Sequence, residues 1–151
     1  VGVEPGHHSG ASSLVLGAVE KTTLDPDLVV FLPSLDNFAA HRAGIRFLTD
    51  VEHHDRPCSG FGVKVSTIGT AKNGDGRFVI RGGKIVGLWD YDPDAKQVRY
   101  GLWSAADRRP KMDEIAHSLG TFLREQVGHG MIYALDSVGE QRERNARLPA
   151  G

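Results

Sequence analysis

Side chains that commonly bind metals gather in one short stretch of the sequence. They are Glu52, His53, His54, Asp55 and Cys58. On a loop, neighbouring histidines can share one ion, whereas on a strand they point to opposite faces. No second Cys or His pair follows at zinc-finger spacing. A solvated polar loop is therefore the favoured interpretation, and a metal-dependent enzyme is the weaker alternative.

Cys58 is the single cysteine of the chain. Nothing in the sequence places a histidine base beside it, so a passive, partly buried thiol is favoured over a nucleophile. One cysteine excludes an internal disulfide framework and fits a reducing compartment. The sequence shows neither a signal peptide nor an apolar run long enough to span a membrane. We therefore expect a cytoplasmic protein that does not contact a membrane.

Basic side chains flank a Gly82-Gly83 pair, and residues 76–89 contain no acid. Residues 108–109 form a further basic loop. Guanidinium and ammonium groups contact the phosphates of nucleic acids, although a soluble hairpin end would have a similar composition. The predicted DNA-phosphate contacts are Arg77, Arg81, Lys84 and Arg109.

Aromatic side chains occupy neighbouring predicted strands. They are Trp89, Tyr91, Tyr100 and Trp103. Aromatic rings on one face of a sheet can stack on bases, and Trp89 and Tyr91 share a face because they are two residues apart. These two are the candidate base contacts. The favoured alternative is a hydrophobic core beneath a helix at residues 111–127.

The remaining motifs do not predict a cofactor or a catalytic residue. Asp90, Asp92 and Asp94 alternate around Pro93, but the glycine and distal glutamate of a calcium-binding loop are missing, so a turn is favoured. The sequence contains no phosphate-binding loop, dinucleotide fingerprint or nucleophile elbow. We expect no metal, no cofactor and no catalytic residue in this chain.

The composition predicts one α+β domain. The chain has 151 residues, of which 40% are hydrophobic and 25% charged, and its formal net charge is −1. This balance argues against a disordered polyion and against a uniformly basic nucleic-acid binder. We expect residues 1–27 to be an irregular lead-in and residues 28–148 to be a single domain.

Apolar runs and turn residues predict a mostly antiparallel sheet. Residues 28–32 form a continuous apolar run, which indicates a strand covered on both faces. Further strands are expected at residues 61–65, 77–81, 84–91, 97–103 and 131–135. The Gly82-Gly83 pair predicts a tight hairpin, and residues 92–96 predict a second turn. The resulting meander is either open or barrel-like.

Helical signals lie mainly in the last third of the chain. Pro110 fits the first turn of a helix over residues 111–127, and Ser137 can cap a C-terminal helix over residues 140–148. A short helix is also expected at residues 37–43. The predicted apolar face of the long helix comprises Met112, Ile115, Leu119, Phe122, Leu123 and Val127.

Three segments, in this order, resemble landmarks of a known family. Residues 31–37 read FLPSLDN, residues 84–93 read KIVGLWDYDP, and residues 133–137 read YALDS before the arginine-bearing segment 142–148. The family comprises bacterial winged-helix DNA-binding proteins related to alkylpurine and interstrand-crosslink DNA glycosylases. The likeness covers residues 28–148. It implies the C-terminal, β-rich module of a DNA-binding, glycosylase-like repair protein that contacts double-stranded DNA.

Glycosylases of that family use a glutamine–hydrophobic–glutamine motif in their earlier winged-helix portion. The glutamines here are Gln97, Gln126 and Gln141, and no two are two residues apart. The chain also begins at Val1 rather than Met, as expected for a processed chain or a fragment. The resemblance therefore implies phosphate contacts rather than catalysis. The alternative is a stand-alone small-molecule or protein-interaction module without enzymatic activity, of unknown oligomeric state.

Overall fold

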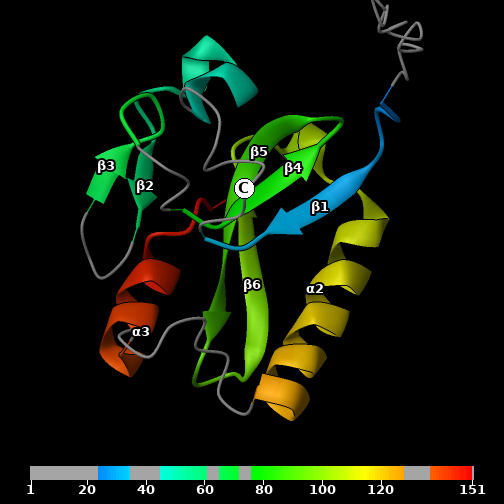
Figure 1. Ribbon diagram of the computed structural model, residues 1–151, viewed down its shortest axis with the longest axis vertical. Helices are drawn as coiled ribbons and strands as arrows, with labels where there is room; N and C mark the ends of the chain where they lie inside the picture. Colours follow the sequence, from blue (N-terminus) through cyan, green and yellow to red (C-terminus); the bar gives the residue numbers. More distant parts are fainter. Residues whose placement is uncertain (1–23, 35–44, 61–64, 72–75, 128–136, 151) are drawn as a thin grey trace, which may run out of the picture.

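The computed structural model describes residues 24–34, 45–60, 65–71, 76–127 and 137–150 (Figure 1). Several sequence predictions lie outside these residues. They concern the lead-in up to residue 23, the helix at 37–43, the strand at 131–135 and all but the last residue of the strand at 61–65.

A four-stranded antiparallel sheet forms the centre of the described structure. Its strands are β1 (Val29–Leu32), β4 (Phe78–Arg81), β5 (Lys84–Asp92) and β6 (Gln97–Leu102), in the order β1-β4-β5-β6. Strands β2 (Pro57–Ser59) and β3 (Val65–Thr67) form a separate antiparallel pair. Together with two helices, this arrangement confirms the predicted α+β class.

The prediction that the meander could be barrel-like is wrong. Within the described residues, β1 and β6 are opposite edges of an open sheet, and no strand joins them. A sheet of four strands is too narrow to close around a layer of side chains. The two edges therefore remain available to line surface features.

The predicted hairpin joins β4 to β5. Arg81 pairs with Lys84 across the turn, and Gly82 and Gly83 both have positive φ values, of 54° and 84°. Two such residues in sequence match the twist of the flanking strands. A Cβ at Gly82 would also lie 2.9 Å from the Pro26 carbonyl oxygen, so glycine is required there for space as well as for conformation.

Two helices pack on the sheet. Helix α2 (Pro110–Phe122) begins with proline and continues into a single π-helical turn over Leu123–Val127. Helix α3 (Val138–Ala146) has the predicted Ser137 cap, which forms a reciprocal capping box with Glu140. The two helices predicted within the described residues are confirmed, with the second beginning two residues earlier than expected. No helix among the described residues is long and apolar enough to cross a membrane.

The sheet buries a hydrophobic cluster on each face. Helix α2 covers one cluster, which includes Phe31, Trp89 and Met112. The other cluster includes Ile68, Phe78 and other side chains from β4, β5 and the segments at residues 45–48 and 68–71. Side chains of β1 alternate between the two clusters, which confirms that this strand is covered on both faces.

The predicted apolar face of α2 is partly wrong. Phe122 and Val127 are 55% and 40% exposed. The buried stripe instead follows Met112, Ala116 and Gly120 before reaching Leu123. Small side chains let the helix approach the sheet closely, since a Cβ at Gly120 would lie only 2.9 Å from the Val98 amide nitrogen. The contact with β6 therefore rotates Phe122 outward.

Met112→Ala tests this packing. Met112 is fully buried, so the substitution should lower the free energy of unfolding by about 2–5 kcal/mol. Phe122→Ala is the matched control on the same helix and should change it by about 0.5 kcal/mol or less. Urea denaturation followed by circular dichroism measures both values. A larger loss for Phe122→Ala than for Met112→Ala would contradict the observed helix orientation.

Candidate functional site

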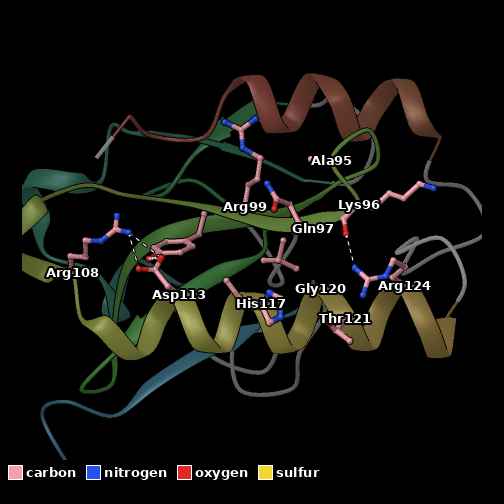
Figure 2. A pocket seen from close by; sticks show the side chains of 13 residues that line it. Ala95, Lys96, Gln97, Arg99, Arg108, Asp113, His117, Gly120, Thr121 and Arg124 are labelled. Carbon is pink, nitrogen blue, oxygen red and sulfur yellow. Dashed lines mark hydrogen bonds and ion pairs between the residues drawn. The ribbon is translucent and has the colours of Figure 1, made fainter.

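A groove of about 430 Å³ lies between α2 and the edge strand β6 (Figure 2). One side is formed by the turn before β6 and by β6 itself, at residues 95–100. The other side is formed by α2, with Asp113, His117 and Thr121 along it. We call this feature the β6–α2 groove. Its volume is within the range of ordinary ligand sites.

Basic side chains dominate the β6–α2 groove. They are Lys96, Arg108 and Arg124. Arg99 also belongs to the lining, but its side chain extends to the opposite face of the sheet, toward α3 (Figure 2), where it pairs with Asp92. Among the described residues that line the groove, Asp113 is the one carboxylate. The lining therefore has an excess of positive charge although the whole chain has a net charge of −1. Such a local excess attracts anions independently of net charge.

The groove arginines make exposed ion pairs. Both Asp113 oxygens accept hydrogen bonds from Arg108 Nη2 at 3.0 Å. The Arg124 guanidinium lies 3.2 Å from a Glu125 oxygen. Exposed pairs of this kind contribute little to stability, because water and salt screen them.

Tyr100 connects the groove to the core. Its ring packs edge-on against Phe31 with the ring centroids 5.4 Å apart, and its hydroxyl donates to Asp113 Oδ1 at 2.7 Å. Burial, followed by the hydrogen bond to the Asp113 carboxylate, raises the pKa of Tyr100 to about 12. The same hydrogen bond, together with Arg108, lowers the pKa of Asp113. Asp113 is thus held as an anion.

The sequence-predicted contact Arg77 lies in the interior. Its Nη1 is 3.1 Å from Asp90 Oδ2, and Arg144 Nε from α3 donates to the same oxygen at 2.5 Å. All three side chains are buried. Burial raises the pKa of Asp90, and the two guanidinium groups and the Tyr91 N–H oppose this shift. Arg77 is therefore a buried structural residue and not a surface residue.

The other three predicted phosphate contacts lie outside the groove, each beside a carboxylate. Arg81 lies 3.1 Å from Asp107. Arg109 Nε lies 2.9 Å from Asp27 Oδ1, and Lys84 pairs with Asp50. The structure therefore does not bring Arg77, Arg81, Lys84 and Arg109 together into one site.

Trp89 and Tyr91, the candidate base contacts, are 3% and 4% exposed. Both belong to the cluster beneath α2, as the core interpretation predicted. Trp89 also donates from Nε1 to the Leu32 carbonyl at 2.8 Å. Neither ring is accessible for stacking on a base in this structure.

The cluster of potential metal ligands is dispersed. His53 packs on Trp103 with the ring centroids 4.9 Å apart, whereas His54 Nε2 donates to the Arg46 carbonyl at 3.1 Å. Cys58 is buried in the second hydrophobic cluster. No group of three potential metal ligands occurs within the described part of the chain. The predicted turn at Asp92 is confirmed, since its carboxylate accepts the N–H groups of Asp94 and Ala95.

Sequence reasoning missed the groove residues Lys96, Arg99 and Arg124. Lys96 is two residues from Asp94, Arg99 is flanked by Val98 and Tyr100, and Arg124 is next to Glu125, so no local basic run marks them. Arg108 was recognised only as part of a basic loop. The excess positive charge appears only when α2 packs beside β6.

Comparisons with known proteins do not identify relatives. No protein-family model, curated protein or solved structure matches this chain.

Asp90→Asn tests the buried ion pairs. The substitution keeps the shape of the side chain but leaves Arg77 and Arg144 facing a neutral amide. The free energy of unfolding should fall by about 3–5 kcal/mol. Asp94→Asn is the matched control, because Asp94 pairs with Arg142 on the surface and its loss should change the free energy of unfolding far less. Equal effects in denaturant unfolding would contradict a structural role for Asp90.

The environment of Tyr100 predicts a measurable alkaline titration. Because its pKa in the folded state exceeds the ordinary value of 10.0, Tyr100 contributes stability below pH 10 that is lost as the pH rises toward 12. Ultraviolet titration of the phenolate, with Tyr100→Phe subtracted, should give a pKa near 12. Asp113→Asn should lower that pKa but keep it above 10.0, since burial is the larger cause. A pKa unaffected by Asp113→Asn would contradict the hydrogen bond.

Proposed function

We propose that this chain is a DNA-binding module that contacts phosphates through the β6–α2 groove. The observation that carries the proposal is that the basic side chains Lys96, Arg108 and Arg124 line one groove. Arginine forms strong, geometrically matched hydrogen bonds with phosphate oxygens. The exposed carboxylate partners of these arginines are readily exchanged.

The family resemblance in the sequence supports the same proposal. It suggests that this chain is the C-terminal module of a cytoplasmic winged-helix protein with a role in DNA repair. Catalysis would then belong to another part of that protein. Phosphate contacts without base contacts produce binding that depends on salt and not on base sequence. The burial of Trp89 and Tyr91 fits this mode, because these rings are not available to bases.

A second candidate is a binding module for an apolar ligand or protein segment. A groove of about 490 Å³ lies on the other side of α2, where the helix meets the edge strand β1. Val29, Phe31, Ile115 and Leu119 contribute apolar surface to it. Binding at this groove would depend little on salt, which distinguishes it from phosphate binding.

Charge reversal in the β6–α2 groove tests the proposal. Lys96→Glu/Arg124→Glu should weaken binding of double-stranded DNA at least tenfold, because two phosphate contacts are replaced by repulsion. The slope of log K against log salt should become shallower by about 1.8. Fluorescence anisotropy of a labelled duplex at several salt concentrations measures both quantities.

Arg81→Glu/Lys84→Glu is the control with an identical change in net charge. It should retain more affinity than the groove variant, and circular dichroism verifies that both variants fold. If only this hairpin variant loses affinity, the phosphates bind at the hairpin and the groove proposal is wrong. If the unmodified protein does not bind duplex DNA at low salt, the DNA-binding proposal itself fails.

A further inference from the structure

Strand β1 has one paired side and one open side. It pairs with β4 in a continuous antiparallel register. The Gly82 N–H donates to the Leu28 carbonyl at 2.9 Å, so every second residue from Leu28 onward directs its backbone groups toward β4. The residues between them, Val29 and Phe31, direct their N–H and C=O groups to the other side. Among the strands that the structure describes, none pairs with that side of β1.

The open side of β1 lacks the features that usually keep an edge strand single. Natural edge strands commonly carry charged residues, proline or a bulge, which disfavour pairing with another chain. The opposite edge of the sheet, β6, follows this rule because it contains Arg99. Strand β1 reads VVFL, with no charge and no bulge, and Pro33 comes only after its last residue. Such an edge pairs readily with a further strand.

A groove of about 490 Å³ follows this edge, between β1 and α2. The three successive residues 29–31 line it. Because successive side chains of a strand point to opposite faces, a groove that touches all three runs along the edge itself. On the helix side, Ile115 and Leu119 are only partly buried. Lys111 and Glu114 contribute one charge of each sign, so the lining has no net charge.

We infer that this edge and its groove bind a second copy of the chain, with the β1 strands of the two copies pairing antiparallel. The inference goes beyond the proposed DNA-binding function and does not depend on it. A two-fold axis at Val30 places Val29 of each copy opposite Phe31 of the other copy. These are the residues whose backbone groups are directed outward, so every outward N–H and C=O of both residues gains a partner.

A second copy suits this surface because the surface is its own complement. The symmetric register satisfies the outward backbone groups of both copies at once, and neutral linings meet without electrostatic repulsion. The axis that relates two antiparallel strands is perpendicular to their sheet, so the α2 helices of both copies lie on the same face. The partly buried Ile115 and Leu119 then lie beside the new seam and lose exposed apolar surface.

Sedimentation velocity of the full chain, from about 1 µM to about 100 µM, tests the inference. We expect a reversible equilibrium between monomer and dimer. Hydrogen–deuterium exchange followed by NMR then locates the interface. The amides of Val29 and Phe31 should exchange at least tenfold more slowly in the dimer, whereas the Val30 amide, which is directed toward β4, should be protected in both states.

Ser118→Arg tests the groove side of the contact. Ser118 is exposed and lines the groove, so the substitution places like charges of both copies at the seam. It should weaken dimerisation at least tenfold. His117→Arg is the matched control, because it introduces the same side chain at the next residue of α2, which lines the β6–α2 groove instead. The control should retain the dissociation constant of the unmodified protein, and circular dichroism verifies that both variants fold.

Three results would overturn the inference. A monomer at every concentration would do so and would leave the open edge to an extended segment of a different protein. A dimer in which the Val29 and Phe31 amides exchange as fast as in the monomer would place the contact elsewhere. Equal dissociation constants for Ser118→Arg and His117→Arg would exclude the groove from the interface. Duplex binding is measured separately, so none of these results bears on the proposed function.

Discussion

The packing of α3 on the central sheet depends on the buried carboxylate of Asp90. It lies on the central strand β5 and bonds to Arg77, just before β4, and to Arg144 of α3. Asn145 of α3 adds a hydrogen bond from its side-chain nitrogen to the Tyr91 carbonyl at 2.8 Å. A buried carboxylate is costly unless its partners are correctly placed, so these contacts restrict where α3 can lie on the sheet.

The opposite face of the sheet depends on packing rather than on charge. Helix α2 presents Ala116 and Gly120 to the sheet and therefore lies very close to β6. This close approach determines the surface on both sides of the helix. A basic groove forms where α2 meets β6, and an apolar groove forms where it meets β1. One helix thus separates two surfaces of different chemistry, which the two proposed modes of binding would use.

The distribution of charge explains why net charge is a poor guide to this protein. A formal charge of −1 conceals a groove to which Lys96, Arg108 and Arg124 contribute basic side chains and Asp113 an acidic one. Buried arginines such as Arg77 and Arg144 neutralise Asp90 and contribute little to the surface field, whereas Arg99 and Arg108 are exposed to solvent. Arginine side chains of this protein therefore have different roles according to whether they are buried or exposed.

Most of the local structure follows from short-range patterns in the sequence. These patterns predict the Gly82-Gly83 hairpin, the Ser137 cap, the order of strands along the chain and the core position of Trp89 and Tyr91. Tertiary structure decided which charges are buried and which share a surface. Arg77 resembled a surface residue because its partner Asp90 lies 13 positions away, and Arg144, which shares that carboxylate, lies a further 54 positions along the chain. The groove joins residues 96–99 to residue 124, and no local pattern encodes a contact that forms only when a helix packs beside a strand.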